Sequence, residues 1–136
     1  MAVKSCLAGL AFLLATGVAH AAEECPSAVQ DIDEVILLLN KARGCDRAMK
    51  LFGLCNRGSS GDIRFGAVVE KKCEADFLSR LEPPQKLAYQ REMRTCVRKY
   101  QNEDGTMYRS FTALCRAEVA QRYSRRMRKT AGSLAR

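Results

Sequence analysis

Cysteine and carboxylate side chains are the groups in this 136-residue chain whose type and spacing could support chemistry. The only histidine, His20, lies in a segment that we expect to be removed, so the mature chain would lack the imidazole of a serine or cysteine triad. Glu70 and Glu74 lie one helical turn apart and could flank a sugar as the two carboxyls of a glycosidase do. The same spacing is common on solvated helix faces, where Lys71 and Lys72 also lie. We therefore predict no enzymatic activity, no catalytic residue, no cofactor and no metal.

Six cysteines follow the first 21 residues, and they are separated by 20, 10, 18, 23 and 19 positions. The spacing contains no C-x-x-C pair, which disfavours a zinc knuckle or a thioredoxin-type site. An even number of cysteines in a small exported chain is typical of a disulfide framework. The cysteines that we expect to form disulfides are Cys25, Cys45, Cys55, Cys73, Cys96 and Cys115.

The first 21 residues have the pattern of a secretory signal peptide. Lys4 supplies a positive start, an almost unbroken apolar run extends from Cys6 to Val18, and Ala19-His20-Ala21 places small residues where a signal peptidase cuts. The apolar run is well short of the roughly 20 residues that cross a bilayer, which disfavours a retained membrane anchor. We predict cleavage after Ala21, a periplasmic or secreted location, and no integral membrane segment in the mature chain.

The mature chain is predicted to be a compact all-α bundle of about five short helices. Removal of 21 of the 136 residues leaves 115, which suits one domain. Apolar residues recur at helical spacing throughout, and no segment shows the sustained alternation of a strand. We assign residues 22–130 to a single helical domain and residues 131–136 to a disordered basic tail.

Turn and capping residues mark the expected helix starts, and the brief turns between helices predict antiparallel neighbours. Gly105 suits a turn position with positive φ. The expected starts are Ser27 with Gln30 as a capping box for a helix over 28–43, Gly44 before a helix over 45–57, Asp62 as the cap of the third helix, Pro83-Pro84 at the fourth, and Thr106 as the cap of the fifth.

The disulfide pairing follows from the antiparallel arrangement. Bridged residues need Cα atoms within about 7 Å, and facing residues of a helical hairpin lie at similar distances from its turn. Cys45 and Cys73 lie 14 and 13 residues from the turn at 59–60, so they should pair. The main alternative joins Cys73 to Cys96 across the next turn, at unequal depth. The same rule pairs Cys25 with Cys55 and Cys96 with Cys115.

Positive charge is concentrated at the carboxyl end. Residues 22–105 carry 14 basic and 14 acidic residues, whereas residues 106–136 carry eight basic residues and one acidic residue, Glu118. The simple interpretation is a solvated helix face, and the functional one is a strip that binds lipid head groups, another polyanion or an acidic partner. Aromatic residues interleave with these arginines, but an exported protein rarely meets nucleic acid, so we expect no such partner. The predicted anion-binding or partner-binding residues are Arg109, Arg116, Arg122, Arg125, Arg126, Arg128 and Lys129.

One stretch, residues 87–126, combines several recognisable motifs. A helix ends in arginine, a small spacer and cysteine; a Gly-Thr-Met turn follows; and a second cysteine heads an arginine-rich helix. The residues concerned are Arg94, Cys96, Gly105, Thr106, Met107, Cys115 and Arg122. This combination resembles the LprI-type lysozyme-inhibitor domain family, although the tryptophan that the family carries before the first of these cysteines is absent. The resemblance implies a small helical envelope protein that binds a protein partner, with a lysozyme-like hydrolase as a candidate.

Two functional hypotheses from different classes follow. In the first, the chain is an exported interaction protein that binds a protein partner through a helical face. In the second, it is a cationic envelope protein that binds anionic lipid or another polyanionic surface through its last helix.

Overall fold

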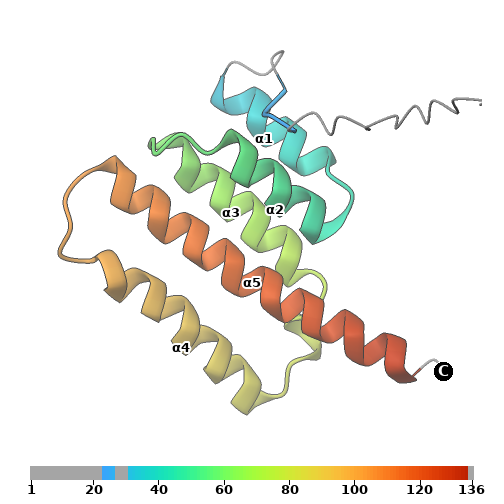
Figure 1. Ribbon diagram of the computed structural model, residues 1–136. Helices are drawn as coiled ribbons and strands as arrows, with labels where there is room; N and C mark the ends of the chain where they lie inside the picture. The colour runs from blue at the N-terminus through green and yellow to red at the C-terminus, as the bar shows by residue number, and fades with distance from the viewer. Residues whose placement is uncertain (1–22, 27–30, 135–136) are drawn as a thin grey trace, which may run out of the picture.

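A 29-residue helix, α5 (Thr106–Leu134), is at the centre of the computed structural model of this protein (Figure 1). The structure describes residues 23–26 and 31–134, and within them all regular structure is helical, as predicted. In that part of the chain, no helix is long and apolar enough to cross a bilayer. The remaining elements are α1 (Ile32–Lys41), α2 (Gly44–Cys55), α3 (Gly61–Glu74), the short 3₁₀ helix η1 (Leu78–Arg80) and α4 (Pro83–Tyr100).

Helix α5 lies between α3 and α4, so these two helices, consecutive in sequence, are not packed on each other. Figure 1 shows the order α1, α2, α3, α5, α4 across the molecule. The sequence predicts an antiparallel neighbour across every short turn, and this prediction is wrong for α3 and α4. The segment that contains η1 carries the chain past α5, and α4 then packs on the opposite side of α5.

A stripe of small side chains on α5 allows α3 to approach it closely. The stripe follows helical spacings of three and four residues, and all its members are buried. On α3, Gly66 faces this stripe, and a Cβ atom at Gly66 would lie 2.8 Å from the Cβ and 3.0 Å from the carbonyl oxygen of Ala113. The stripe consists of Ser110, Ala113, Ala117, Ala120 and Ser124.

Replacing Gly66 with valine is expected to lower the free energy of unfolding by about 1–3 kcal/mol. The new side chain would meet the backbone of Ala113, which cannot move aside as a flexible side chain can. Gly53 on α2 has no atom within 4 Å of a built Cβ, so Gly53→Val is the matched control and should cost little. Urea unfolding of both variants with the disulfides intact would measure the difference. Equal urea midpoints for the two variants would show that the contact between α3 and α5 tolerates a larger side chain at position 66.

Two carboxylates fix α5 to both ends of α3. Asp62 is fully buried and accepts hydrogen bonds from the Ser110 hydroxyl at 2.7 Å and from the backbone N–H groups of Arg57 and Ser59. At the other end, the hydroxyl of Ser124 donates to Asp76.

The prediction that Asp62 is the cap of the third helix is therefore wrong. The N-cap residue of α3 is Ser60, and Asp62 lies inside the first turn. Its carboxylate instead accepts hydrogen bonds from the turn that precedes the helix, because that turn folds back over the side chain.

Helix ends differ from the prediction at three further places. Helix α1 begins after Asp31, which forms a capping box with Glu34, while residues 27–30 with the predicted Ser27 box lie outside the described residues. Thr106 is the first helical residue of α5, and its hydroxyl donates to the carbonyl of Gly58 rather than capping its own helix. Helix α5 also continues through residues 131–134, which the sequence assigns to a disordered tail, while residues 135–136 lie outside the described range.

The predicted disulfide pairing is confirmed in full. The Cα–Cα distances are 4.9 Å for Cys25–Cys55, 4.6 Å for Cys45–Cys73 and 5.7 Å for Cys96–Cys115. The alternative Cys73–Cys96 pair does not form, because α5 separates the helices that carry these residues.

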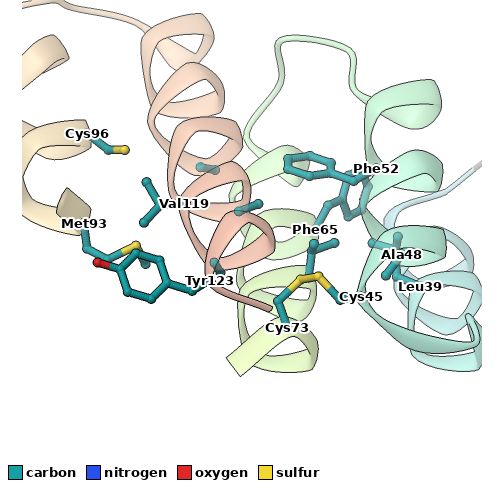
Figure 2. Close-up of a cluster of buried hydrophobic side chains, with 14 of the residues drawn as sticks. Leu39, Cys45, Ala48, Phe52, Phe65, Cys73, Met93, Cys96, Val119 and Tyr123 are labelled. Atoms are coloured by element: carbon teal, nitrogen blue, oxygen red, sulfur yellow. A yellow bond between two sulfur atoms is a disulfide. The ribbon is translucent and has the colours of Figure 1, made fainter. Parts of the chain in front are cut away.

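Buried side chains form a core on both sides of α5. Figure 2 shows the Cys45–Cys73 disulfide between α2 and α3. On the other side, Met93 of α4 lies near Tyr123 of α5. Two of the disulfides, Cys45–Cys73 and Cys96–Cys115, thus join helices that also share a hydrophobic core, and the third joins Cys25, ahead of α1, to the end of α2.

Candidate functional site

An open groove lies between α3 and α4, with α5 as its floor. It exists because both helices pack extensively on α5, whereas their backbones do not pack closely on each other. The groove has two halves of about 940 and 920 Å³. The halves are continuous, since both are lined by Glu70, Lys71, Glu74 and Arg116.

A fixed polar network occupies the centre of the groove. Arg116 on the floor donates from Nε and from a terminal nitrogen to the two oxygens of Glu70, at 2.9 and 2.7 Å, which is the strong bidentate geometry. The hydroxyl of Tyr89 donates to Glu74 at 2.8 Å. Burial, and then this hydrogen bond, raise the pKa of Tyr89, while the hydrogen bonds to Glu70 raise the pKa of Arg116. The groove therefore presents a positioned guanidinium and two carboxylates that already accept hydrogen bonds.

Apolar side chains form the rim of one half of the groove. Ile63 of α3 is 40% exposed and Val97 of α4 is 44% exposed, and both line the same half. Next to them, the rings of Tyr100, Tyr108 and Phe111 pack together with centroids 5.8–6.2 Å apart. Exposed aliphatic and aromatic groups around a fixed polar centre are typical of a surface that buries a partner.

Charge differs between the two ends of the groove. The half with the apolar rim ends at Glu103 and Asp104, in the turn between α4 and α5. The other half is lined by Lys86 and Arg94 of α4. Two acidic residues therefore lie in the turn before α5, with Arg109 of α5 in the same half of the groove, and two basic residues of α4 line the other half.

The predicted basic strip is divided between different faces of α5. Arg109 and Arg116 are seven positions apart and share one face, whereas a second face carries residues at spacings of three and four, Arg122, Arg125, Arg126 and Lys129. Arg109 and Arg116 line the groove. Arg122 donates to Glu92 of α4 at 2.8 Å. Three of the seven predicted anion-binding residues are thus near α4 or in the groove, away from the free end of the helix.

The other four basic residues lie on the last turns of α5. Arg125 and Arg128 both pair with Asp46 of α2. Arg126 stacks over the ring of Tyr123, with its guanidinium carbon 5.3 Å from the ring centroid. Lys129 is exposed. Sequence reasoning grouped these residues correctly at one end but could not show which of them already have counter-ions.

The contact between α4 and α5 at Glu92 is expected to depend on pH. Burial would raise the pKa of Glu92, but hydrogen bonds from Tyr123 and Arg122 outweigh it and lower the pKa below its usual value of 4.5. A carboxyl with a lowered pKa stabilises the fold above its unfolded pKa and loses that contribution as the pH falls through the folded value.

Glu92→Gln should therefore be slightly less stable than the unmodified protein at neutral pH, and the two should converge at a pH below the lowered pKa of Glu92. The difference should stay below about 1 kcal/mol, since the Glu92 side chain is 38% exposed. Urea midpoints at both pH values would measure it. A difference that does not change with pH would contradict the assignment.

The described residues contain no cluster of three or more histidine, cysteine, aspartate or glutamate side chains that could hold a metal ion. Comparison of the chain with protein-family models, with curated proteins and with solved structures finds no match. The LprI resemblance thus rests on residues 87–126 alone. In the structure these residues form most of α4, the turn with Gly105 at a φ of 110°, and most of α5.

Proposed function

We propose that this chain is an exported, non-enzymatic protein that binds a protein partner in the groove between α3 and α4. The observation that supports this proposal best is the continuous groove with Ile63 and Val97 exposed on its rim and the Arg116–Glu70 pair fixed at its centre. Helical partners commonly bind by laying an apolar face into such a groove. A positioned charged pair then orients the partner, because misplaced polar groups would be buried without hydrogen bonds.

Export is the part of the proposal that concerns location. The signal-peptide pattern of residues 1–21 and three disulfides both suit an oxidising compartment such as the periplasm or the cell exterior. The groove would then face partners in the cell envelope.

A lysozyme-like hydrolase is the candidate partner that the family resemblance implies. Many lysozymes are basic, and Glu103 and Asp104, which outnumber Arg109 at this end of the groove, offer them a complementary surface. The basic residues from Arg125 onwards lie 19 positions beyond Thr106, which is about 28 Å along α5. That distance exceeds three Debye lengths of about 8 Å at physiological ionic strength, so solvent ions screen the repulsion.

A cell-wall lysis assay tests this candidate partner. The oxidised mature protein in stoichiometric excess should slow lysis by lysozyme, and Val97→Asp should weaken this inhibition at least about tenfold by placing a charge on the apolar rim. Leu37→Asp is the matched control, because Leu37 is also an exposed aliphatic residue of a helix, at 53%, but lies on α1 outside the groove. Unchanged lysis with the unmodified protein would exclude lysozyme inhibition. Equal inhibition by both variants would exclude the groove as the site.

A further inference from the structure

We propose that the free end of α5, residues 125–134, docks on the surface of an anionic phospholipid bilayer. We call this segment the α5 overhang. Ser124 is the last buried residue of α5, and from residue 125 onwards each residue is exposed or, at Met127, half-buried. Figure 1 shows the end of α5 extending past the neighbouring helices. The overhang is thus a continuation of α5 that contacts the rest of the fold through Met127 and through the ion pairs of Arg125 and Arg128 with Asp46.

The overhang is amphipathic on a small scale. Met127, Ala131 and Leu134 follow each other by four and three positions and so lie on one face, and Leu134 is 84% exposed. This face continues the buried stripe of Ala120 and Tyr123. Met127 still packs partly against the core, whereas Ala131 and Leu134 lie on the exposed end of α5 that extends past the neighbouring helices. A helix with an uncovered apolar face beside arginine and lysine is suited to the interface of an anionic bilayer, where both kinds of side chain find partners.

Arg125 and Arg128 already hold an anion in this structure, which is the carboxylate of Asp46. Arg125 Nε and a terminal nitrogen of Arg128 donate to its two oxygens at 2.7 and 2.5 Å, and Gln121 donates at 2.7 Å. Burial would raise the pKa of Asp46, but these hydrogen bonds outweigh it and lower the pKa, which keeps the carboxylate ionised. Asp46 therefore competes with lipid phosphates for the same two guanidinium groups.

Charge complementarity favours a bilayer over a compact anionic ligand. Arg126 and Lys129 are exposed and form no ion pair within the described residues, so they are free to meet head groups while Asp46 still holds the other two. A small anion would engage the arginines alone, whereas a bilayer engages the cations and Leu134 together. Binding that requires both the basic residues and Leu134 would therefore indicate a lipid surface, whereas binding that requires the basic residues alone would indicate another polyanion.

Sedimentation with vesicles of equal parts phosphatidylglycerol and phosphatidylcholine tests the charge requirement. The oxidised mature protein should bind, and binding should be lost as salt rises from about 0.01 M to about 1 M. Arg126→Gln with Lys129→Gln should weaken binding roughly 25-fold, since each basic residue contributes about fivefold. Arg98→Gln with Lys99→Gln is the matched control: it removes the same charge, and Lys99 stacks on Tyr100 as Arg126 does on Tyr123. Equal losses in the two double variants, or no binding at low salt, would overturn the proposal.

Two single variants test the rest of the mechanism. Asp46→Asn should bind the vesicles about fivefold more tightly, because it removes one negative charge from beside Arg125 and Arg128. Leu134→Ser should weaken vesicle binding but leave retention on immobilised heparin unchanged. Weaker or unchanged vesicle binding by Asp46→Asn would contradict the role of Arg125 and Arg128 in docking. No effect of Leu134→Ser on vesicle binding would overturn docking on lipid and leave only general binding of polyanions. Val97→Asp should bind vesicles as the unmodified protein does, because Val97 lies in the groove. A failed test of lipid docking can therefore be distinguished from a failed test of partner binding in the groove.

Discussion

Replacing Cys45 and Cys73 together by alanine is expected to lower the free energy of unfolding by about 3–5 kcal/mol. The bridge closes a loop with a sequence separation of 28, and restricting such a loop in the unfolded chain accounts for roughly 3.5 kcal/mol. Both residues are fully buried in the core, so loss of the sulfur atoms also removes core contacts. That loss is a large fraction of the 5–15 kcal/mol by which domains are usually stable.

The matched control for this prediction is the pair Cys96→Ala and Cys115→Ala. That bridge closes a shorter loop, with a sequence separation of 19, and Cys115 is only partly buried. We expect a smaller loss, near 3 kcal/mol, because the bridge joins α4 to α5 outside the core between α2 and α3. Guanidinium unfolding under oxidising conditions would measure both variants. A larger loss from the second pair would contradict the assignment of Cys45–Cys73 as the main clamp.

Asp62→Ala is expected to be the most costly replacement of a polar side chain, at roughly 3–5 kcal/mol. The carboxylate is fully buried and accepts from the hydroxyl of Ser110 and from two backbone N–H groups, those of Arg57 and Ser59. Alanine would remove the acceptor of both backbone N–H groups and leave the Ser110 hydroxyl only its longer contact of 3.3 Å with Asn56 Oδ1. Each partly buried donor that loses its partner costs about 1–3 kcal/mol. The loss also disconnects the turn before α3 from α5.

Asp33→Ala is the matched control, because Asp33 forms only an exposed ion pair with Arg64. Its effect should be within about 0.5 kcal/mol of zero. Ser110→Ala should cost about 1 kcal/mol, since the two backbone donors to Asp62 remain satisfied. Thermal and urea unfolding would rank the three variants. A cost of Asp62→Ala close to that of Asp33→Ala would show that the buried carboxylate does not hold the turn.

Local sequence signals were sufficient for the helices and the disulfides. Gly and Pro residues mark the turns, and the nearly equal distances of Cys45 and Cys73 from the turn at 59–60 determine their pairing. The helix ends depend on residues close in sequence, and the disulfide pairing depends on the geometry of a single helical hairpin.

The insertion of α5 between α3 and α4 could not be predicted from turn lengths. Residues 75–82 are enough to carry the chain around α5, yet a short turn favours the simpler assumption of adjacent helices. The available signal was the small-residue stripe from Ser110 to Ser124 opposite Gly66, which permits an unusually close helix pair. The groove follows directly from this insertion, so Ile63 and Val97 were missed as rim residues.

The sequence shows that basic residues are concentrated at the carboxyl end, but it does not show which of them form ion pairs with carboxylates. Arg116, Arg122 and Arg125 pair with carboxylates that lie 46, 30 and 79 positions away in the sequence. Such pairs depend on the packing of whole helices. Only the structure therefore separates the cations that stabilise the fold from those at the free end of α5.

Site-specific photo-crosslinking is the most direct test of the groove as a partner-binding surface. A photoreactive phenylalanine analogue at position 97 on the groove rim and one at position 37 on α1 would be compared in the envelope of cells that export the protein. We predict a discrete adduct with one protein from position 97, none from position 37, and loss of the adduct when Ile63 is replaced by aspartate. The same adducts from both positions, or none from position 97, would contradict the proposed function.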